Sequence, residues 1–183
     1  MANALSLCRV LLALPFGLLM LRTDAGSALW AAAFLCIAIL TDLIDGPLAR
    51  RRGTVSKLGG ALDHGSDFIF VSAGLLALAW RGAIPWLLPP LVALAFAQYV
   101  IDSLWIERRP ELRMSAIGRY NGIFYFVPSG VDIGVRLGLA VLAAPNRWLA
   151  LGLVLTTLVS MADRLFARSA RLPRAPGSPD AGR

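Results

Sequence analysis

Six apolar stretches in this chain are each long enough to cross a ~30 Å hydrocarbon core as an α-helix. They run over residues 5–21, 27–49, 59–80, 84–105, 117–143 and 147–166. Of the 183 residues, 57% are hydrophobic and only 16% are charged, which is more apolar surface than a soluble domain of this length can bury. We therefore expect an all-α integral membrane protein with six transmembrane helices.

The expected domain organisation is simple. One six-helix domain covers residues 1–170, and residues 171–183 form a disordered tail rich in proline and basic residues. The first apolar stretch resembles a signal peptide, but Arg9 lies inside it and five more stretches follow. We therefore expect it to be a retained helix.

The basic residues predict the orientation in the membrane and exclude one class of partner. With the N-terminus in the cytoplasm, the outer connections hold only Arg22, Arg81 and Arg147 among the 18 Lys and Arg residues. The positive-inside rule then places both termini on the cytoplasmic side. The net charge of +7 is spread between apolar stretches rather than gathered on one face, which fits anionic lipid headgroups and not a nucleic acid.

Four aspartates stand where apolar stretches meet a basic loop: Asp42, Asp45, Asp63 and Asp67. Carboxylates at the edge of a bilayer are costly, so four of them together need a strong counter-charge. Helical residues three or four apart share a face, so each pair of aspartates lies on one stripe. The short connection makes the two helices antiparallel neighbours, and the pairs then face each other. Divalent cations prefer such oxygen ligands, and two of them would clamp a diphosphate.

The residues around the aspartates fit the same chemistry. Gly46, Ala49 and Gly59 allow the close approach of a backbone or a ligand. Arg50 has the geometry to bridge phosphate oxygens. Asp67, the deepest of the four acids, is the best candidate for the base that takes a proton from an attacking hydroxyl. In the competing interpretation the acids are separate polar caps at helix ends, which leaves their matched spacing unexplained.

The full pattern from Asp42 to Asp67 reads Asp-x2-Asp-Gly-x2-Ala-Arg-x8-Gly-x3-Asp-x3-Asp. It resembles the signature of the CDP-alcohol phosphotransferase (CDP-alcohol phosphatidyltransferase) family, with every signature position filled. The resemblance implies a six-helix membrane enzyme in which an alcohol attacks the lipid-bearing phosphorus of a CDP-linked donor, commonly CDP-diacylglycerol, and CMP leaves. It also implies these site residues: Mg²⁺ or Mn²⁺ at Asp42, Asp45, Asp63 and Asp67, Asp67 also as base, and a nucleotide and diphosphate site at Gly46, Ala49, Arg50 and Gly59.

The N-terminal segment gives a first indication of the alcohol. Asn3, Ser6 and Arg9 resemble the Asn-x2-Thr-x2-Arg opening of phosphatidylglycerophosphate and cardiolipin synthases in this family. Two roles are open for Arg9: it contacts the donor phosphates, or it extends to the membrane interface as long basic side chains do.

Three arginines are candidates for binding an acceptor phosphate: Arg113, Arg119 and Arg136. Residues 115–122 partly resemble the Ser-x2-Gly-Lys-x-Lys-Thr segment of phosphatidylglycerophosphate synthases, with Arg119 in place of the first Lys. Arg136 lies four residues after Asp132, so an internal ion pair is the alternative there. His64 projects about 100° from Asp63 around its helix, so we expect it to contact headgroups rather than a metal.

Together these features predict a phospholipid synthase of a bacterial inner membrane, with its active site facing the cytoplasm. It transfers a phosphatidyl group from CDP-diacylglycerol to glycerol 3-phosphate or, as the alternative, to inositol phosphate or another polyol. The family resemblance adds a homodimer. An intramembrane prenyltransferase also uses Asp-rich motifs with magnesium, but it lacks the Gly-x2-Ala-Arg pattern. A small cation transporter requires acids nearer to the middle of the bilayer.

Overall fold

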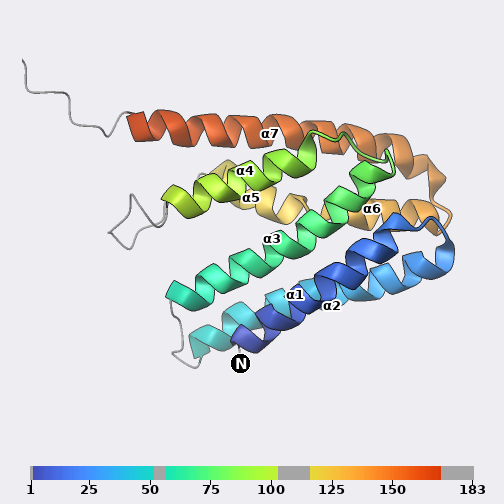
Figure 1. The fold of residues 1–183 in the computed structure, drawn as a ribbon, viewed down its shortest axis with the longest axis horizontal. Helices are drawn as coiled ribbons and strands as arrows, with labels where there is room; N and C mark the ends of the chain where they lie inside the picture. The colour runs from blue at the N-terminus through green and yellow to red at the C-terminus, as the bar shows by residue number, and fades with distance from the viewer. Residues whose placement is uncertain (1, 52–56, 103–115, 170–183) are drawn as a thin grey trace, which may run out of the picture.

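The computed structural model describes residues 2–51, 57–102 and 116–169, with their side chains over 6–44, 62–102 and 120–166. Within these ranges the regular structure is entirely helical (Figure 1). The helices are α1 (Ala2–Leu21), α2 (Ala25–Arg51), α3 (Lys57–Trp80), α4 (Leu88–Ile101), α5 (Ala116–Phe124), α6 (Val127–Arg136), the short 3-10 helix η2 (Ala140–Leu142) and α7 (Ala143–Ser169). The all-α prediction is confirmed, while the tail predicted at 171–183 lies outside the described residues.

Three helical segments in the described ranges are long and apolar enough to cross a membrane: Ala25–Ile44, Leu62–Trp80 and Ala140–Phe166. Ser6–Leu21 and Leu88–Ile101 are apolar but shorter. The prediction of six spans is therefore supported in part. Three spans have the full length, two are shorter, and the stretch predicted as the fifth span is interrupted.

The interrupted stretch is residues 117–143, which form α5, α6 and η2 instead of one continuous helix. The break falls at Tyr125 and Phe126, shortly before Pro128. Proline cannot donate a backbone hydrogen bond and its ring clashes with the preceding turn, so it disfavours a continuous helix. A new helix begins instead with Pro128 in its first turn, where a missing N–H costs little. The two halves still lie end to end along the bundle (Figure 1).

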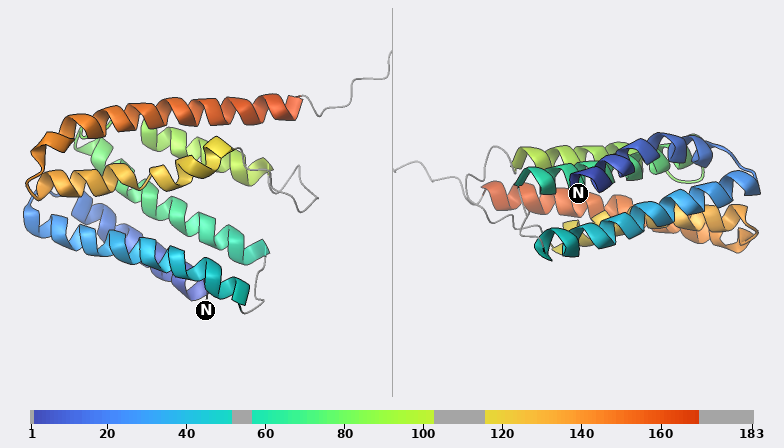
Figure 2. Two further views of the ribbon diagram at one scale, coloured as in Figure 1. Left: turned by 180° about the vertical axis from the view of Figure 1, so that it is seen from behind. Right: turned by 90° about the horizontal axis from the view of Figure 1, so that it is seen from below.

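Helix α1 is the packing partner that α2 and α3 share. It packs against both of them, whereas α2 and α3 make few direct backbone contacts within the described residues. Helices α2 and α3 run antiparallel, as predicted (Figure 1), and α1 rather than each other is their main packing partner. Seen from below, α1, α3 and α4 form one layer, and α2 with α5 and α6 forms a second (Figure 2, right). Helix α7 packs on α4, α5 and α6.

The two ends of the bundle differ. One end, here named the site end, gathers the start of α1, the end of α2, the start of α3 and the end of α7 (Figure 1). The opposite end, named the far end, holds the turns after α1, α3 and α6. Four tryptophans near the far end are exposed: Trp30, Trp80, Trp86 and Trp148. Such a gathering of exposed indoles is typical of a membrane–water interface.

Local chemistry sets the turns at the far end. Asp24 accepts hydrogen bonds from the hydroxyl and the N–H of Ser27, both 2.7 Å long, and so caps α2. These bonds hold the pKa of Asp24 below its ordinary value, so the cap is present at neutral pH and is lost only as the pH falls through that lowered pKa. Gly82 and Gly138 follow the ends of α3 and α6 with φ of 73° and 112°, a conformation that glycine adopts most readily.

Close packing around one glycine fixes the core between α1, α3 and α6. The rings of Phe16 and Phe70 stack with their centroids 4.3 Å apart. Gly74 lies beside them, and a Cβ at that position would come within 2.7 Å of both Phe16 Cε1 and Ser129 Oγ. Because only a residue without a side chain fits here, Gly74 sets how closely the three helices approach.

Gly74→Ala is expected to lower the thermal stability of the protein, because an overpacked core site typically costs about 1–3 kcal/mol. The measurement is the Tm of the purified protein in detergent micelles. Gly152→Ala in α7 is the matched control, since nothing lies within 4 Å of a Cβ at that position. Equal Tm values for the two variants would contradict the role given to Gly74.

Candidate functional site

The guanidinium of Arg9, on α1, is the centre of a charged cluster at the site end. Its Nη1 donates hydrogen bonds to Asp63 Oδ1 at 3.2 Å, to Ser66 Oγ at 3.1 Å and to Asp67 Oδ1. Its Nη2 lies 3.6 Å from Asp42 Oδ1. Three of the four predicted acids, carried by α2 and α3, are thus brought together around one cation from α1.

The members of this cluster differ in their exposure. The side chain of Arg9 is 0% exposed, whereas those of Asp67, Asp63 and Asp42 are 25%, 32% and 46% exposed. Asp67 is the least exposed of these three acids, as its predicted depth requires. The burial of Arg9 excludes the interfacial role considered for it. A buried charge of this kind is stable only when it is paired and hydrogen-bonded, and the aspartates supply both.

Helical spacing explains how α3 contributes three groups to one point. Asp63, Ser66 and Asp67 are three and four residues apart and therefore share a face. The Ser66 hydroxyl also donates to the backbone oxygen of Asp63 at 2.8 Å, which fixes its position. The sequence predicted the acids of this face but not their pairing with Arg9. The signal was available, because a charged residue inside an apolar stretch needs an opposite charge.

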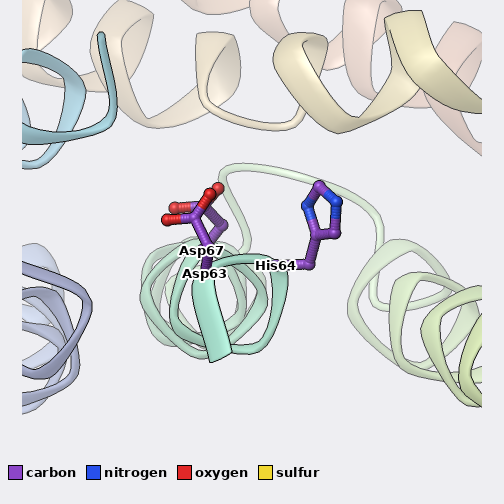
Figure 3. A group of neighbouring side chains, drawn as sticks. All are labelled: Asp63, His64 and Asp67. Atoms are coloured by element: carbon purple, nitrogen blue, oxygen red, sulfur yellow. The ribbon is translucent and has the colours of Figure 1, made fainter. Parts of the chain in front are cut away.

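His64 occupies a different side of α3. Figure 3 shows the carboxylates of Asp63 and Asp67 together, while the ring of His64 leaves the helix in another direction. This ring lies edge-on to Tyr99 of α4, with centroids 5.9 Å apart. One ring nitrogen of His64 and one oxygen of each carboxylate nevertheless lie within 4.8 Å of one another. His64, expected to contact headgroups, therefore joins the candidate metal ligands.

The donor set fits a hard divalent cation. Carboxylate oxygens are the ligands that Mg²⁺ and Mn²⁺ prefer, and an imidazole nitrogen is compatible with Mn²⁺. Each carboxylate has two oxygens, so contact with Arg9 through Oδ1 leaves a second oxygen for a cation. Arg9 neutralises only part of the charge of Asp42, Asp63 and Asp67, and the cluster stays negative.

Other predicted site residues lie where side chains are not described. The backbone of Asp45, Gly46, Ala49 and Arg50 belongs to the end of α2, that of Gly59 to the start of α3 and that of Arg119 to α5. Arg113 lies outside the described residues altogether. The roles predicted for these residues stay predictions.

Arg136 is not brought to this site. It lies at the far end, where its Nε is 3.0 Å from Asp132 Oδ2. Its Nη1 donates to the backbone oxygens of Leu19 and Arg22, each at 3.1 Å. Of the two roles considered for Arg136, the internal ion pair with Asp132 is confirmed.

Arg81 completes this second cluster. Its Nη2 and Nη1 donate to the two carboxylate oxygens of Asp132 at 2.7 and 3.1 Å. Along α3, about 21 Å of helix separates Arg81 from Asp67 at ~1.5 Å per residue. The far-end cluster of Arg81, Asp132 and Arg136 is therefore remote from the aspartate cluster, and its contacts bind helices to one another.

Comparison with known proteins adds a family and several relatives. The chain matches the CDP-alcohol phosphatidyltransferase family over residues 1–161. It is 36% identical over 124 residues to the cardiolipin synthase (CMP-forming) of Streptomyces coelicolor, and the alignment covers 64% of this chain and 57% of that protein. It is 31% identical over 137 residues to a probable phosphatidylglycerophosphate synthase of Mycobacterium tuberculosis, covering 73% and 65%. A CDP-diacylglycerol--glycerol-3-phosphate 3-phosphatidyltransferase of Escherichia coli is 29% identical over 121 residues, covering 63% and 66%.

These alignments cover only part of each relative. The chain spans between 57% and 66% of the length of the three proteins. The family match, by contrast, covers most of this chain and includes all four aspartates and Arg9.

Asp132→Asn is expected to destabilise the fold strongly, because it leaves two largely buried arginines without their counter-charge. Breaking one partner of a buried ion pair typically costs about 3–5 kcal/mol. The measurement is again the Tm in detergent micelles, and Asp163→Asn is the control because that acid is exposed on α7. A loss no larger for Asp132→Asn than for Asp163→Asn would show that the far-end cluster does not hold the helices together.

Proposed function

The chain belongs to the CDP-alcohol phosphatidyltransferase family, and on that premise we propose that it transfers a phosphatidyl group from CDP-diacylglycerol to the hydroxyl of a small alcohol and releases CMP. One observation carries the proposal. Asp42, Asp63 and Asp67, which the family signature includes, converge from two helices at one end of an apolar bundle. Such a cluster suits a substrate whose charged diphosphate lies at the headgroup level of a membrane.

The proposed reaction exchanges one bond to phosphorus for another. The acceptor oxygen bonds to the phosphorus that bears the diacylglycerol, the bond from that phosphorus to CMP breaks, and CMP leaves with the electron pair. Asp67 takes the proton of the hydroxyl. Its side chain is 25% exposed, which leaves it accessible to substrate in a largely desolvated position, as a general base requires.

We assign the metal and donor sites by the family signature. Asp42, Asp45, Asp63 and Asp67 would hold two divalent ions, Mg²⁺ or Mn²⁺, which would supply stabilisation of the charge on the attacking and leaving oxygens. The nucleotide and diphosphate contacts fall to Gly46, Ala49, Arg50 and Gly59. Their support is their position on the last turns of α2 and the first turn of α3, next to the described aspartates.

Glycerol 3-phosphate is the proposed acceptor, bound by Arg113 and Arg119. The names of two relatives support it: a phosphatidylglycerophosphate synthase and a glycerol-3-phosphate 3-phosphatidyltransferase. A second candidate is phosphatidylglycerol, favoured by the 36% identity to a cardiolipin synthase that forms CMP. Inositol phosphate or another polyol remains the alternative within the same chemistry. Arg136 has a structural role in this proposal, because it is engaged at the far end.

The membrane placement is also part of the proposal. The helices are apolar and the relatives are bacterial, so we place the protein in a bacterial inner membrane. The arginine distribution puts the site end on the cytoplasmic side. The family resemblance adds a homodimer.

Asp67→Asn is expected to lower CMP release at least about 100-fold, because a positioned general base contributes ~10²–10⁴ to a rate. The assay is CMP release by purified protein in mixed micelles with CDP-diacylglycerol, glycerol 3-phosphate and Mn²⁺. Asp24→Asn is the matched control, since it changes an acid at the far end to a residue that also caps helices. Full activity of Asp67→Asn would exclude it as the base, and release that survives EDTA would exclude the metal requirement.

A panel of acceptors tests the alcohol. Wild-type protein is offered glycerol 3-phosphate, phosphatidylglycerol, inositol phosphate and serine separately, and CMP release is measured for each. We expect glycerol 3-phosphate to give the fastest release. Faster release with phosphatidylglycerol would favour the second candidate, and no release with any of the four would count against the proposed function.

A further inference from the structure

Arg9 is an unusual cation for a site proposed to hold divalent metals. Among the described side chains it contacts three aspartates of the signature, Asp42, Asp63 and Asp67. A guanidinium stays protonated at any pH a protein survives, so this positive charge is permanent. It therefore competes electrostatically with any metal ion held by the same carboxylates.

The position of Arg9 is also fixed. Its side chain has no exposed surface, and it rises from α1, which packs tightly on α3. The hydroxyl of Ser66 accepts a hydrogen bond from its Nη1 and is itself tied to the backbone of Asp63. Among the described side chains Arg9 contacts three carboxylates and the Ser66 hydroxyl, so its charge acts directly on the groups proposed to hold the metals.

We propose that Arg9 is an internal counter-ion that makes metal binding at this site depend on the diphosphate of the donor. This inference rests on the proposed function. Counted among the metal ligands alone, the charges of four aspartates and two divalent ions balance completely, and Arg50, proposed to contact the diphosphate, lies outside that set. With Arg9 the metal-loaded site carries a surplus positive charge, and an anionic diphosphate removes it.

Elementary electrostatics gives the direction and size of the effect. A divalent ion on a carboxylate of this cluster lies within a few ångströms of the guanidinium, where like charges repel appreciably even in a solvent as polar as water. Removing the charge of Arg9 should therefore tighten metal binding by about tenfold or more. It should also reduce the cooperativity between metal binding and diphosphate binding, because such coupling is reciprocal.

The test is a Mn²⁺ titration of purified protein in nanodiscs, with free Mn²⁺ followed by EPR, in the absence and presence of cytidine 5′-diphosphate, and the Mn²⁺ that the nucleotide itself binds is measured with empty nanodiscs and subtracted. For wild type we expect the nucleotide to tighten Mn²⁺ binding. Arg9→Met should bind Mn²⁺ about tenfold more tightly without the nucleotide and gain less from it. Arg9→Lys keeps the charge and should stay within about threefold of wild type.

Arg81→Met is the matched control. It also removes a largely buried arginine from an ion pair, but at the far end, so it should lower the Tm without changing Mn²⁺ affinity. Arg9→Gln replaces Arg9→Met if the latter does not fold, since the amide keeps a donor for the carboxylates.

Three results would overturn the assignment. The first is that the neutral variants bind Mn²⁺ no more tightly than wild type. The second is that Arg9→Lys binds Mn²⁺ as Arg9→Met does. The third is that wild type does not bind Mn²⁺, or that the nucleotide does not change its affinity for Mn²⁺. The second would mean that the fork geometry of Arg9, not its charge, matters. The titration measures binding and not activity, so the two proposals can fail separately. If the protein shows the expected Mn²⁺ binding but releases no CMP, the proposed function is wrong and the role of Arg9 in metal binding still holds.

Discussion

The packing of this bundle depends on one buried charge. Arg9 enters on α1 with no exposed surface, and a guanidinium in that position is tolerated only with acidic partners. Those partners are on α2 and α3, so α1 must lie against both helices, as it does. The position of α1 and the assembly of the aspartates are therefore consequences of the same interaction. In a site built this way, the same side chains set the electrostatics and bring the helices together.

At the far end, arginine–aspartate ion pairs again hold helices together. The last carbonyls of α1 have no partners within the helix, and Arg81 and Arg136 donate to those of Met20 and Leu19. Asp132 in turn holds both arginines. In lipid, the burial of apolar side chains provides little driving force for helix association, so polar contacts and close packing must stabilise the bundle. Helix α1 is consequently held at both ends by arginines and along its middle by the contact at Gly74.

Sequence reasoning succeeded where a local rule decides the outcome. The helical class follows from the apolar stretches, and the common face of Asp63 and Asp67 follows from their spacing. It failed where the outcome depends on several helices at once. The break before Pro128 requires knowing that other helices accommodate an interrupted span. The contact of His64 with Tyr99, and the choice of these particular aspartates as partners of Arg9, join residues that no local pattern relates.

The order of exposure within the site, from Arg9 outward through Asp67 to Asp42, has a chemical consequence. A positive charge buried beneath the carboxylates costs no reorganisation when a reaction begins, because packed helices already hold it in place. On the proposed function, the donor keeps its acyl chains in lipid while its diphosphate meets the exposed rim. The aspartates then lie beside the reacting phosphate, and the guanidinium of Arg9 lies where solvent cannot screen its charge. That arrangement separates an enzyme of the membrane surface from a transporter, whose acids must form a path across the bilayer.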